Sequence, residues 1–309
     1  MTLSLKLAAR RDLTREICEF TFTATSGALP PFTAGAHLTV QTPSGAWRSY
    51  SICNDDRVSD RYVIAVKREE GGRGGSLSMH RDLAVGDVIA ARAPKNAFEL
   101  TENAPTLLIA GGIGITPMLA MLRRLVARAA PVHLIYLTRS ADLAAYRDLL
   151  TAPPFAPHVT LHHDEGRNFY DFWPHFETVS DQHIYYCGPP ALMDAIYLHT
   201  VHWPRSQIHS ESFAGVDSTD GTASPFRLRR HTTGQVFDIP ADKSVLDVLR
   251  DNDIAFASSC ESGTCGTCKM RLVAGAPLHR DLVLSDSEKL NYFMPCVSRA
   301  AGEELTLEF

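Results

Sequence analysis

Four cysteines toward the C-terminus are the residues of this chain most able to do chemistry. Cys260, Cys265 and Cys268 lie in "CESGTCGTC", and Cys296 follows in "MPCVSRA". Thiolates are soft ligands that select zinc, copper(I) or iron–sulfur clusters. A zinc ribbon usually offers two short cysteine pairs, whereas here a lone cysteine precedes one short pair and another follows far downstream.

The spacing CxxxxCxxC with a distant fourth cysteine is the ligand pattern of plant-type [2Fe–2S] clusters. The residues between the ligands are small, and Gly263 and Gly266 let the backbone wrap closely and point N–H groups at sulfur. We therefore expect the four cysteines to hold a [2Fe–2S] cluster, with zinc as the alternative. The remaining cysteines, Cys18, Cys53 and Cys187, lie on strand-like segments, and we expect Cys18 and Cys53 to be buried as small hydrophobic residues.

Composition limits the class of protein. The chain has 309 residues, of which 45% are hydrophobic and 21% charged, as in ordinary globular proteins of two or three domains. A formal net charge of −5 gives no reason to expect a nucleic-acid or membrane partner. No apolar run approaches the roughly 20 residues of a spanning helix, and Lys6, Arg10 and Arg11 interrupt the start where a signal peptide is apolar. We expect a cytoplasmic protein.

The pattern of apolar residues divides the chain. Residues 1–102 alternate apolar and polar positions in short runs such as "HLTVQT", which predicts an antiparallel β-barrel. Residues 103–214 alternate buried strands with helical patterns, which is typical of an open, parallel α/β sheet. Residues 215–224, "GVDSTDGTAS", have no apolar anchor and predict a linker. Residues 225–309 hold the cysteines, preceded by the helical pattern "SVLDVLRDN".

Two loops of the α/β segment could bind an anion. In "GGIGITPM", Gly112 and Gly114 precede a helix for which Thr116 is the N-cap candidate and Pro117 the first residue. A helix start behind close-packed glycines suits a pyrophosphate, although a tight turn without a ligand is the alternative. Ligands bind outside the carboxyl ends of the strands in such sheets. The second loop of this kind, in "YYCGPPALM", holds Cys187, Gly188 and Pro189.

A further phosphate site is predicted in the first segment. Arg48 in "WRSYSIC" supplies a planar, bidentate cation, with a surface ion pair as the alternative role. In "GRGGS", Gly74, Gly75 and Ser76 place N–H groups and a hydroxyl at a helix that begins near Ser76. Together the two motifs predict a phosphate cradle.

The order RxYS, GxGGS, GGIGITPM, CGPP and a C-terminal plant-type ferredoxin motif resembles the phthalate dioxygenase reductase family over nearly the whole chain. Vanillate demethylase reductases are close relatives of that family. The resemblance implies a multidomain protein with an FMN-binding barrel, an NAD-binding α/β domain and an α+β, β-grasp ferredoxin domain. It also implies that electrons pass from NADH through FMN and the cluster to a Rieske-type oxygenase component. The cofactors carry the redox chemistry, so we assign no general acid or base.

The resemblance also assigns roles to individual residues. The flavin would be bound by Arg48, Ser49, Tyr50, Ser51, Val66, Lys67, Gly75 and Ser76. The nicotinamide nucleotide would be bound by Gly112, Gly114, Thr116, Pro117, Cys187, Gly188 and Pro189. The residues at the reacting rings would be Ser51 and Thr116, which orient the flavin against the nicotinamide, and Phe213 in "HSESF", which covers one flavin face.

The choice of nucleotide and of acceptor is less constrained. Asp164 in "LHHDEG" could accept a ribose hydroxyl pair, which suits NADH, whereas Arg139 in "LTRS" could meet a 2′-phosphate. We favour NADH, and we expect a monomer. The alternatives are a reductase for another acceptor, such as a diiron hydroxylase, and a zinc-binding, nucleotide-responsive regulator. Visible absorbance bleached by NADH would exclude the regulator.

Overall fold

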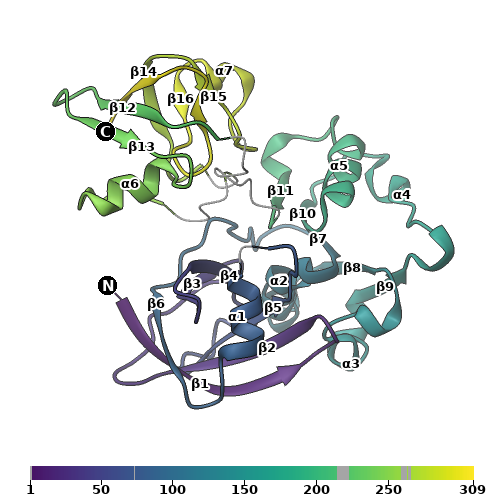
Figure 1. Cartoon of the computed structure of the whole chain (residues 1–309). Helices are drawn as coiled ribbons and strands as arrows, with labels where there is room; N and C mark the ends of the chain where they lie inside the picture. Colours follow the sequence, from purple (N-terminus) through teal and green to yellow (C-terminus); the bar gives the residue numbers. More distant parts are fainter. Residues whose placement is uncertain (1, 73, 214–222, 259–262, 264–265) are drawn as a thin grey trace. The chain divides into compact units, whose positions relative to one another are not determined.

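The computed structural model describes residues 2–72, 74–213, 223–258, 263 and 266–309 (Figure 1). The chain forms two compact units, Met1–Ser212 and Phe213–Phe309. Most of the predicted linker, 215–224, and two of the predicted cluster ligands, Cys260 and Cys265, lie outside the described residues. Among the helices of the described residues, none is long and apolar enough to cross a membrane.

The first unit begins with the predicted antiparallel barrel. Its six strands have the order β4-β3-β6-β1-β2-β5, and a bridge between Ile52 and Ile64 joins the two edges. Alternate residues of β2, including Phe20 and Phe22, are fully buried in the barrel core, as the period of two predicts. The elements are β1 (Thr2–Asp12), β2 (Ile17–Ala24), β3 (His37–Gln41), β4 (Trp47–Ser51), β5 (Tyr62–Lys67), α1 (Gly75–Asp82) and β6 (Val88–Arg92).

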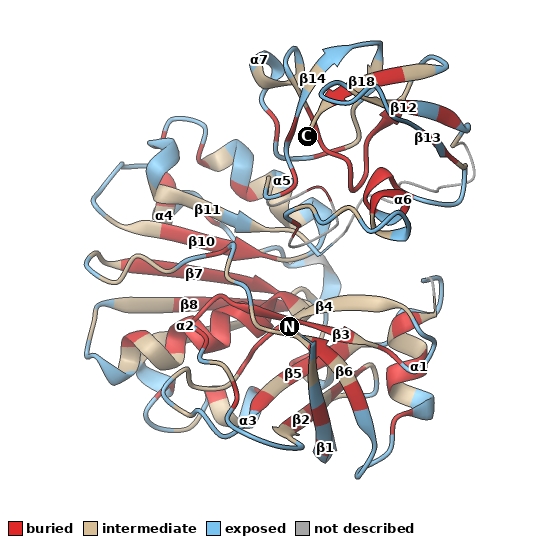
Figure 2. Cartoon of the chain, turned by 90° about the vertical axis from the view of Figure 1, so that its left-hand side faces the viewer, coloured by how far each residue is buried: buried red, intermediate tan, exposed pale blue. Residues whose placement is uncertain are grey.

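The same unit continues into a five-stranded, wholly parallel sheet of order β11-β10-β7-β8-β9. Its central strands are buried on both faces, so they read as continuous apolar runs (Figure 2). The elements are β7 (Thr106–Gly111), α2 (Ile115–Ala127), β8 (Val132–Thr138), α3 (Arg147–Leu150), β9 (Val159–His163), α4 (Trp173–Phe176), β10 (His183–Cys187), α5 (Pro190–His199) and β11 (Ile208–Glu211). Single 3₁₀ turns are η1 (Gly112–Gly114), η2 (Ala141–Leu143), η3 (Ala156–His158), η4 (Glu165–Arg167) and η5 (Arg205–Gln207).

The two faces of this sheet have separate cores. Leu108 and Ala110 of β7 pack with α2 in one cluster, whereas Leu107 and Ile109 pack with α4 and α5 residues in another. The α2 cluster also contains residues of the barrel, including Ala34 and Phe98. The barrel and the sheet therefore share one hydrophobic core within the first unit.

The predicted start of α2 is wrong. The helix begins at Ile115 with Gly114 as its N-cap, so Thr116 and Pro117 are its second and third residues. The reason is that η1 precedes it and Gly114 already has helical angles, φ −61° and ψ −7°. The Thr116 hydroxyl donates instead to the Ile113 carbonyl at 3.0 Å. Proline is tolerated there because the first N–H groups of a helix have no partner inside it.

The second unit contains a mixed sheet of order β13-β12-β18-β14-β16 that packs against one helix, the β-grasp arrangement expected of a ferredoxin domain. The predicted helix is confirmed, with Ser244 and Asp247 forming a capping box at its start. The elements are β12 (Phe226–Arg230), β13 (Val236–Ile239), α6 (Val245–Asp251), β14 (Met270–Ala274), β15 (Pro277–Leu278), α7 (Asp286–Lys289), β16 (Tyr292–Phe293), β17 (Arg299–Ala300) and β18 (Glu304–Glu308).

A buried arginine fastens the segments of this unit. Arg299, three residues after Cys296, is only 1% exposed. Its guanidinium donates to the carbonyls of Lys243, Ser224 and Pro240, each at 2.9 Å. One side chain therefore joins the segment before β12 to the turn between β13 and α6, three residues after a predicted cluster ligand.

We predict that Arg299→Met lowers the free energy of unfolding of this unit by about 3 kcal/mol, because it removes three hydrogen bonds made by one buried guanidinium. Urea denaturation followed by circular dichroism measures the change. Arg227→Met is the matched control, since Arg227 is 54% exposed and its ion pair with Glu304 lies on the surface. Equal stability of the two variants would contradict the role of Arg299.

Candidate functional site

Arg48 and the start of α1 lie side by side, as the phosphate cradle requires. A Cβ atom added to Gly75 would lie 3.0 Å from Arg48 Cγ and 3.1 Å from Arg48 Nε. Gly74 has a φ of 77°, a left-handed conformation that favours glycine. Within the described part of the chain, no side chain caps α1. The bare positive end of the helix and the guanidinium together fit a phosphate group.

The neighbouring residues of the predicted flavin site have local roles as well. The Ser76 hydroxyl accepts a hydrogen bond from the Glu69 N–H at 3.1 Å, and Lys67 Nζ pairs with the Glu69 carboxylate at 2.7 Å. Both contacts hold the loop between β5 and α1. The Val66 side chain is 1% exposed and lies in the barrel core. Ser76 and Lys67 therefore support the loop that presents Gly75.

Strand β4 carries Ser49, Tyr50 and Ser51. Ser49 shares a 2.9 Å hydrogen bond with Thr39 on β3. Burial raises the pKa of Tyr50 to about 12, although the nearby Arg48 charge lowers it, so the phenol stays protonated at neutral pH. Ser51 is buried, and its hydroxyl donates to Glu211 Oε2 at 3.3 Å.

The two nucleotide loops pack main chain against main chain. A Cβ atom on Gly114 would lie 2.1 Å from the Cys187 carbonyl oxygen, and one on Gly111 would lie 2.6 Å from Pro189 Cδ. Gly112 has a φ of 53°, and a Cβ atom there would meet nothing within 4 Å. The loops therefore meet at the carboxyl ends of β7 and β10, and leave the backbone at Gly112 open. The Ile115 N–H donates within η1, and no side chain of the described residues caps α2, so the N–H groups that follow Ile115 in the first turn fit a pyrophosphate.

Glu211 is a functional candidate that the sequence reading missed. It ends β11, where its register partner on β10 is Cys187. Burial raises the pKa of the Cys187 thiol well above its ordinary value, and the Glu211 charge raises it further, so the thiol stays protonated. Glu211 thus stands between the flavin strand and the nucleotide sheet. In the sequence, Glu211 is the acidic residue of "HSESF", two positions before the predicted site residue Phe213.

Phe213 itself belongs to the second unit and is 41% exposed. Its predicted contact with a flavin stays a prediction. Thr116 is 2% exposed, and its hydroxyl is engaged as a donor to Ile113, which leaves its oxygen as an acceptor. The predicted pair of reacting-ring residues, Ser51 and Thr116, therefore consists of two buried hydroxyls that already donate within the protein.

Asp164 and Arg139 stand at the carboxyl ends of adjacent strands. Thr138 of β8 pairs with His163 of β9, and the Asp164 N–H donates to the Thr138 carbonyl at 2.9 Å. Asp164 Oδ1 lies 3.5 Å from His162 Nε2. The Arg139 side chain is 76% exposed, and its Nη2 lies 3.9 Å from Glu16 Oε2. Both candidates for reading the adenosine ribose therefore lie at one edge of the sheet.

The described part of the cluster site is apolar and rich in tight turns. Cys268 and Cys296 are 2% and 5% exposed, are not in a disulfide, and belong to one hydrophobic cluster. Gly263 and Gly266 have φ values of 79° and 73°, which only glycine adopts readily. A Cβ atom on Gly263 would lie 2.7 Å from Val297 Cγ2. Buried thiols and a loop that turns at two glycines fit a cluster bound by cysteine thiolates.

Comparisons with known proteins agree with this chemistry. Residues 4–100 match the family described as "Oxidoreductase FAD-binding domain", and residues 229–301 match the "2Fe-2S iron-sulfur cluster binding domain". The second match confirms the iron–sulfur interpretation over the zinc alternative.

Individual relatives cover the whole chain. Phthalate dioxygenase reductase from Burkholderia cepacia is 47% identical over 312 residues, which cover 99% of this chain and 97% of that protein. Vanillate O-demethylase oxidoreductase from Pseudomonas putida is 38% identical over 98% of each chain. A solved structure, "phthalate dioxygenase reductase: a modular structure for electron transfer from pyridine nucleotides to [2Fe-2S]", is 46% identical. It covers 100% of this chain and 98% of its own, with a TM-score of 0.84.

We predict that Arg48→Ala raises the Kd for FMN roughly ten- to hundredfold, because a hydrogen bond to a charged group contributes about 1.5–3 kcal/mol. Fluorescence titration of flavin-free protein with FMN measures this. Arg48→Lys should lie between wild type and Arg48→Ala. Arg61→Ala is the control, since Arg61 pairs with Asp60 on the surface of the same barrel. Unchanged FMN affinity in Arg48→Ala would place the phosphate elsewhere.

Proposed function

This chain belongs to the phthalate dioxygenase reductase family, and we propose that it passes electrons from NADH to a Rieske-type oxygenase component. It is a flavin and iron–sulfur oxidoreductase whose cofactors are FMN, a [2Fe–2S] cluster and NADH. When bound, FMN supplies two-electron chemistry toward NADH and one-electron chemistry toward the cluster.

One observation carries the proposal. The Ser51 hydroxyl on barrel strand β4 donates to Glu211 Oε2 on sheet strand β11 at 3.3 Å. β4 bears the flavin motif, and the carboxyl edge of the sheet bears the nucleotide loops. The hydrogen bond therefore brings the two predicted binding sites to one place within the first unit, which is what direct transfer between nicotinamide and flavin needs.

Separate residues of the first unit bind the FMN and the nicotinamide nucleotide. Arg48 and the α1 N–H groups hold the FMN phosphate, and the loop of Gly112 with the start of α2 holds the nucleotide pyrophosphate. Ser51 keeps its proton on Oγ, shared with Glu211, so the hydroxyl oxygen can accept a hydrogen bond from the flavin edge. The half-buried Tyr50 phenol keeps its proton and can donate a hydrogen bond. These groups orient both rings and exclude water from the space between them.

The second unit supplies the exit for electrons. Cys268 and Cys296, with Cys260 and Cys265, would ligate the cluster, and Phe213 would cover one flavin face. The domains are 1–102 for FMN, 103–214 for the nucleotide and 225–309 for the cluster, with 215–224 as the linker. The proposal is supported by the buried, undisulfided thiols of the described ligands.

The partner and setting follow from the same chemistry. Relatives include subunits of oxygenase systems for phthalate and phenoxybenzoate, which supports an oxygenase as the acceptor. We infer that it is of the Rieske type, that this chain acts as a monomer, and that it works in the cytoplasm, where NADH is available. Co-purification from native cells, followed by iron and visible-spectrum analysis of the captured partner, tests the acceptor.

Asp164 should select the nucleotide. Because its carboxylate can accept both hydroxyls of the adenosine ribose, Asp164→Ala should lower kcat/KM for NADH about tenfold, the equivalent of one net hydrogen bond. kcat/KM for NADPH should change little. Ferricyanide reduction measures both. Arg139→Ala is the paired variant, and it should lower kcat/KM only for NADPH. Equal use of NADH and NADPH by the wild type would contradict this assignment.

The cluster should be the obligatory exit to protein acceptors. Cys296→Ser removes a thiolate ligand, so the variant should lack the cluster absorbance and lose nearly all NADH-dependent reduction of cytochrome c. It should still reduce ferricyanide, a small acceptor that takes electrons from flavin directly. Cys18→Ala, which changes a buried cysteine outside the ligand set, is the control. Undiminished cytochrome c reduction in Cys296→Ser would show that flavin donates directly.

A further inference from the structure

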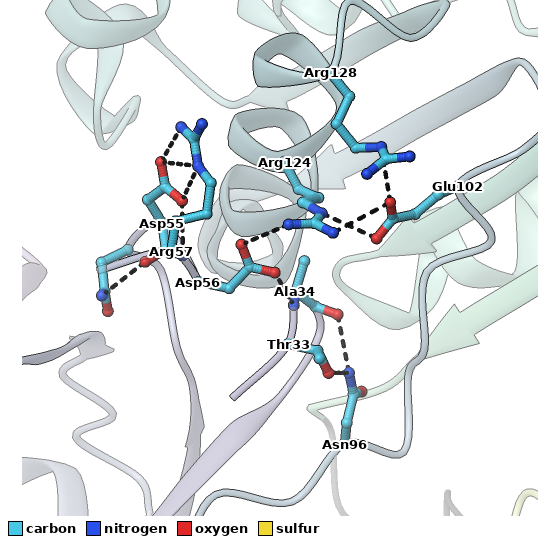
Figure 3. Close-up of polar contacts among 10 residues, drawn as sticks. Thr33, Ala34, Asp55, Asp56, Arg57, Asn96, Glu102, Arg124 and Arg128 are labelled. Carbon is cyan, nitrogen blue, oxygen red and sulfur yellow. Dashed lines mark hydrogen bonds and ion pairs between the residues drawn. The ribbon is translucent and has the colours of Figure 1, made fainter. Parts of the chain in front are cut away.

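A single guanidinium joins the barrel to the nucleotide-binding helix within the first unit. Figure 3 shows Arg124 pointing from α2 between two carboxylates. Its Nη1 lies 3.6 Å from Asp56 Oδ1, and its Nε donates to Glu102 Oε1 at 2.9 Å. Arg128, the C-cap residue that follows α2, pairs with Glu102 at 2.9 Å. Arg124 thus contacts both the barrel and the segment that connects the barrel to the sheet.

Asp56 ties this contact to the flavin strands. It lies five residues after Ser51, in the loop that leaves β4, and its side chain is only 8% exposed. Asp56 Oδ2 accepts a hydrogen bond from the Ala34 N–H at 3.3 Å, on the approach to β3. Because β3 pairs with β4, Asp56 joins Arg124 to both strands at the flavin edge. A buried carboxylate needs such a cation, since desolvation without one is costly.

The other end of α2 is the nucleotide site. α2 begins at Ile115, directly after the glycine loop, and Arg124 lies nine residues along it. At a rise of about 1.5 Å per residue, the guanidinium anchors α2 about 14 Å from the loop. Arg124 therefore cannot contact a pyrophosphate held there. It can affect the nucleotide only through the position of the helix.

The apolar part of the same junction does not by itself fix that position. Met121 Cε would lie 3.0 Å from a Cβ on Gly35, and Met118 and Leu122 share a buried cluster with Phe98. Such contacts stabilise the junction but are not directional, and methionine adapts to small shifts. The hydrogen-bonded fork between Arg124 and Glu102 is directional, and the Asp56 carboxylate adds an ionic contact at 3.6 Å on the other side of the guanidinium.

We propose that Arg124 is a positioning residue for electron transfer from NADH to FMN. By holding Asp56 and Glu102 together it sets the tilt of α2, and thereby the placement of the nicotinamide against the flavin strand. The inference rests on the proposed function. A displaced helix would still bind the nucleotide through its own N–H groups, so the rate of flavin reduction should fall while NADH affinity stays the same.

The test compares Arg124→Met with Arg128→Met in the full-length holoprotein. Arg128→Met removes the other Glu102 ion pair but leaves Asp56 untouched, and it changes a residue of the same type at the C-cap of the same helix. Anaerobic stopped-flow gives the flavin reduction rate at saturating NADH and the apparent Kd. We expect Arg124→Met to slow reduction at least about tenfold, since a misplacement of about 1 Å can cost about a hundredfold. Arg128→Met should stay near the wild-type rate.

A second readout does not use the loaded enzyme. In flavin-free protein, hydrogen exchange of residues 33–38 should be faster in Arg124→Met than in Arg128→Met, because the Asp56 acceptor of the Ala34 N–H loses its cation. Arg124→Lys keeps the charge without the fork and should be intermediate in both measurements. It also provides the test if Arg124→Met does not fold.

The outcomes separate the two levels of inference. If NADH does not reduce the flavin of the wild-type protein, the proposed function is wrong. A wild type that is reduced, with equal rates and equal exchange in the Arg124 and Arg128 variants, would overturn the positioning role alone. A higher Kd for NADH with an unchanged limiting rate would also overturn it, because that result marks a binding contact.

Discussion

The close approach of Gly114 to the main chain of Cys187 is the constraint on which the nucleotide site depends. A single added carbon there would lie 2.1 Å from a carbonyl oxygen. Because the two loops touch through their backbones, the carboxyl edge of β7 and β10 carries no side chain that could fill the space over Gly112. The start of α2, which no side chain of the described residues caps, follows directly after η1, which begins at Gly112. The anion site therefore depends on having glycine, which has no side chain, at Gly112 and Gly114.

The barrel meets this sheet through two kinds of contact with different consequences. The shared cluster of α2 with Ala34 and Phe98 removes apolar surface from water and stabilises the junction. The polar contacts at its two margins, Ser51 with Glu211 and Arg124 with its two carboxylates, add little net free energy but fix direction. Different residues therefore stabilise the junction and set its orientation. A substitution can change the stability without changing the orientation, or the reverse.

The sequence predicted the elements better than the contacts between them. Apolar periodicity located the barrel, the parallel sheet and the capped helix at Ser244, because each of these signals is local. The start of α2 was misplaced because a 3₁₀ turn runs into the helix without an extended residue between them. Threonine is a common N-cap residue, but the backbone before Thr116 is already helical.

The missed residues share a physical reason. Glu211 meets Ser51, and Arg124 meets Asp56, across 160 and 68 positions of the sequence respectively. A charged residue on a loop or a helix surface looks the same in a sequence whether it faces water or another domain. The cofactor motifs could be predicted because glycine and cysteine indicate special backbone conformations or metal ligation by their residue type. The role of an arginine or a glutamate depends on the residue it contacts, which the sequence does not show.

The distribution of charge between β4 and β11 suits the proposed transfer between two redox partners. The cation of the phosphate cradle, Arg48, packs on Gly75. Burial keeps the Tyr50 phenol on β4 and the Cys187 thiol on β10 protonated, so both groups are neutral. The Arg48 charge acts on the Tyr50 phenol, and the Glu211 charge acts on the Cys187 thiol. A ring placed there would gain hydrogen bonds from neutral groups that do not change charge as it gains and loses electrons. Such surroundings reorganise little between redox states, which suits a cofactor that must accept electrons in a pair and release them singly.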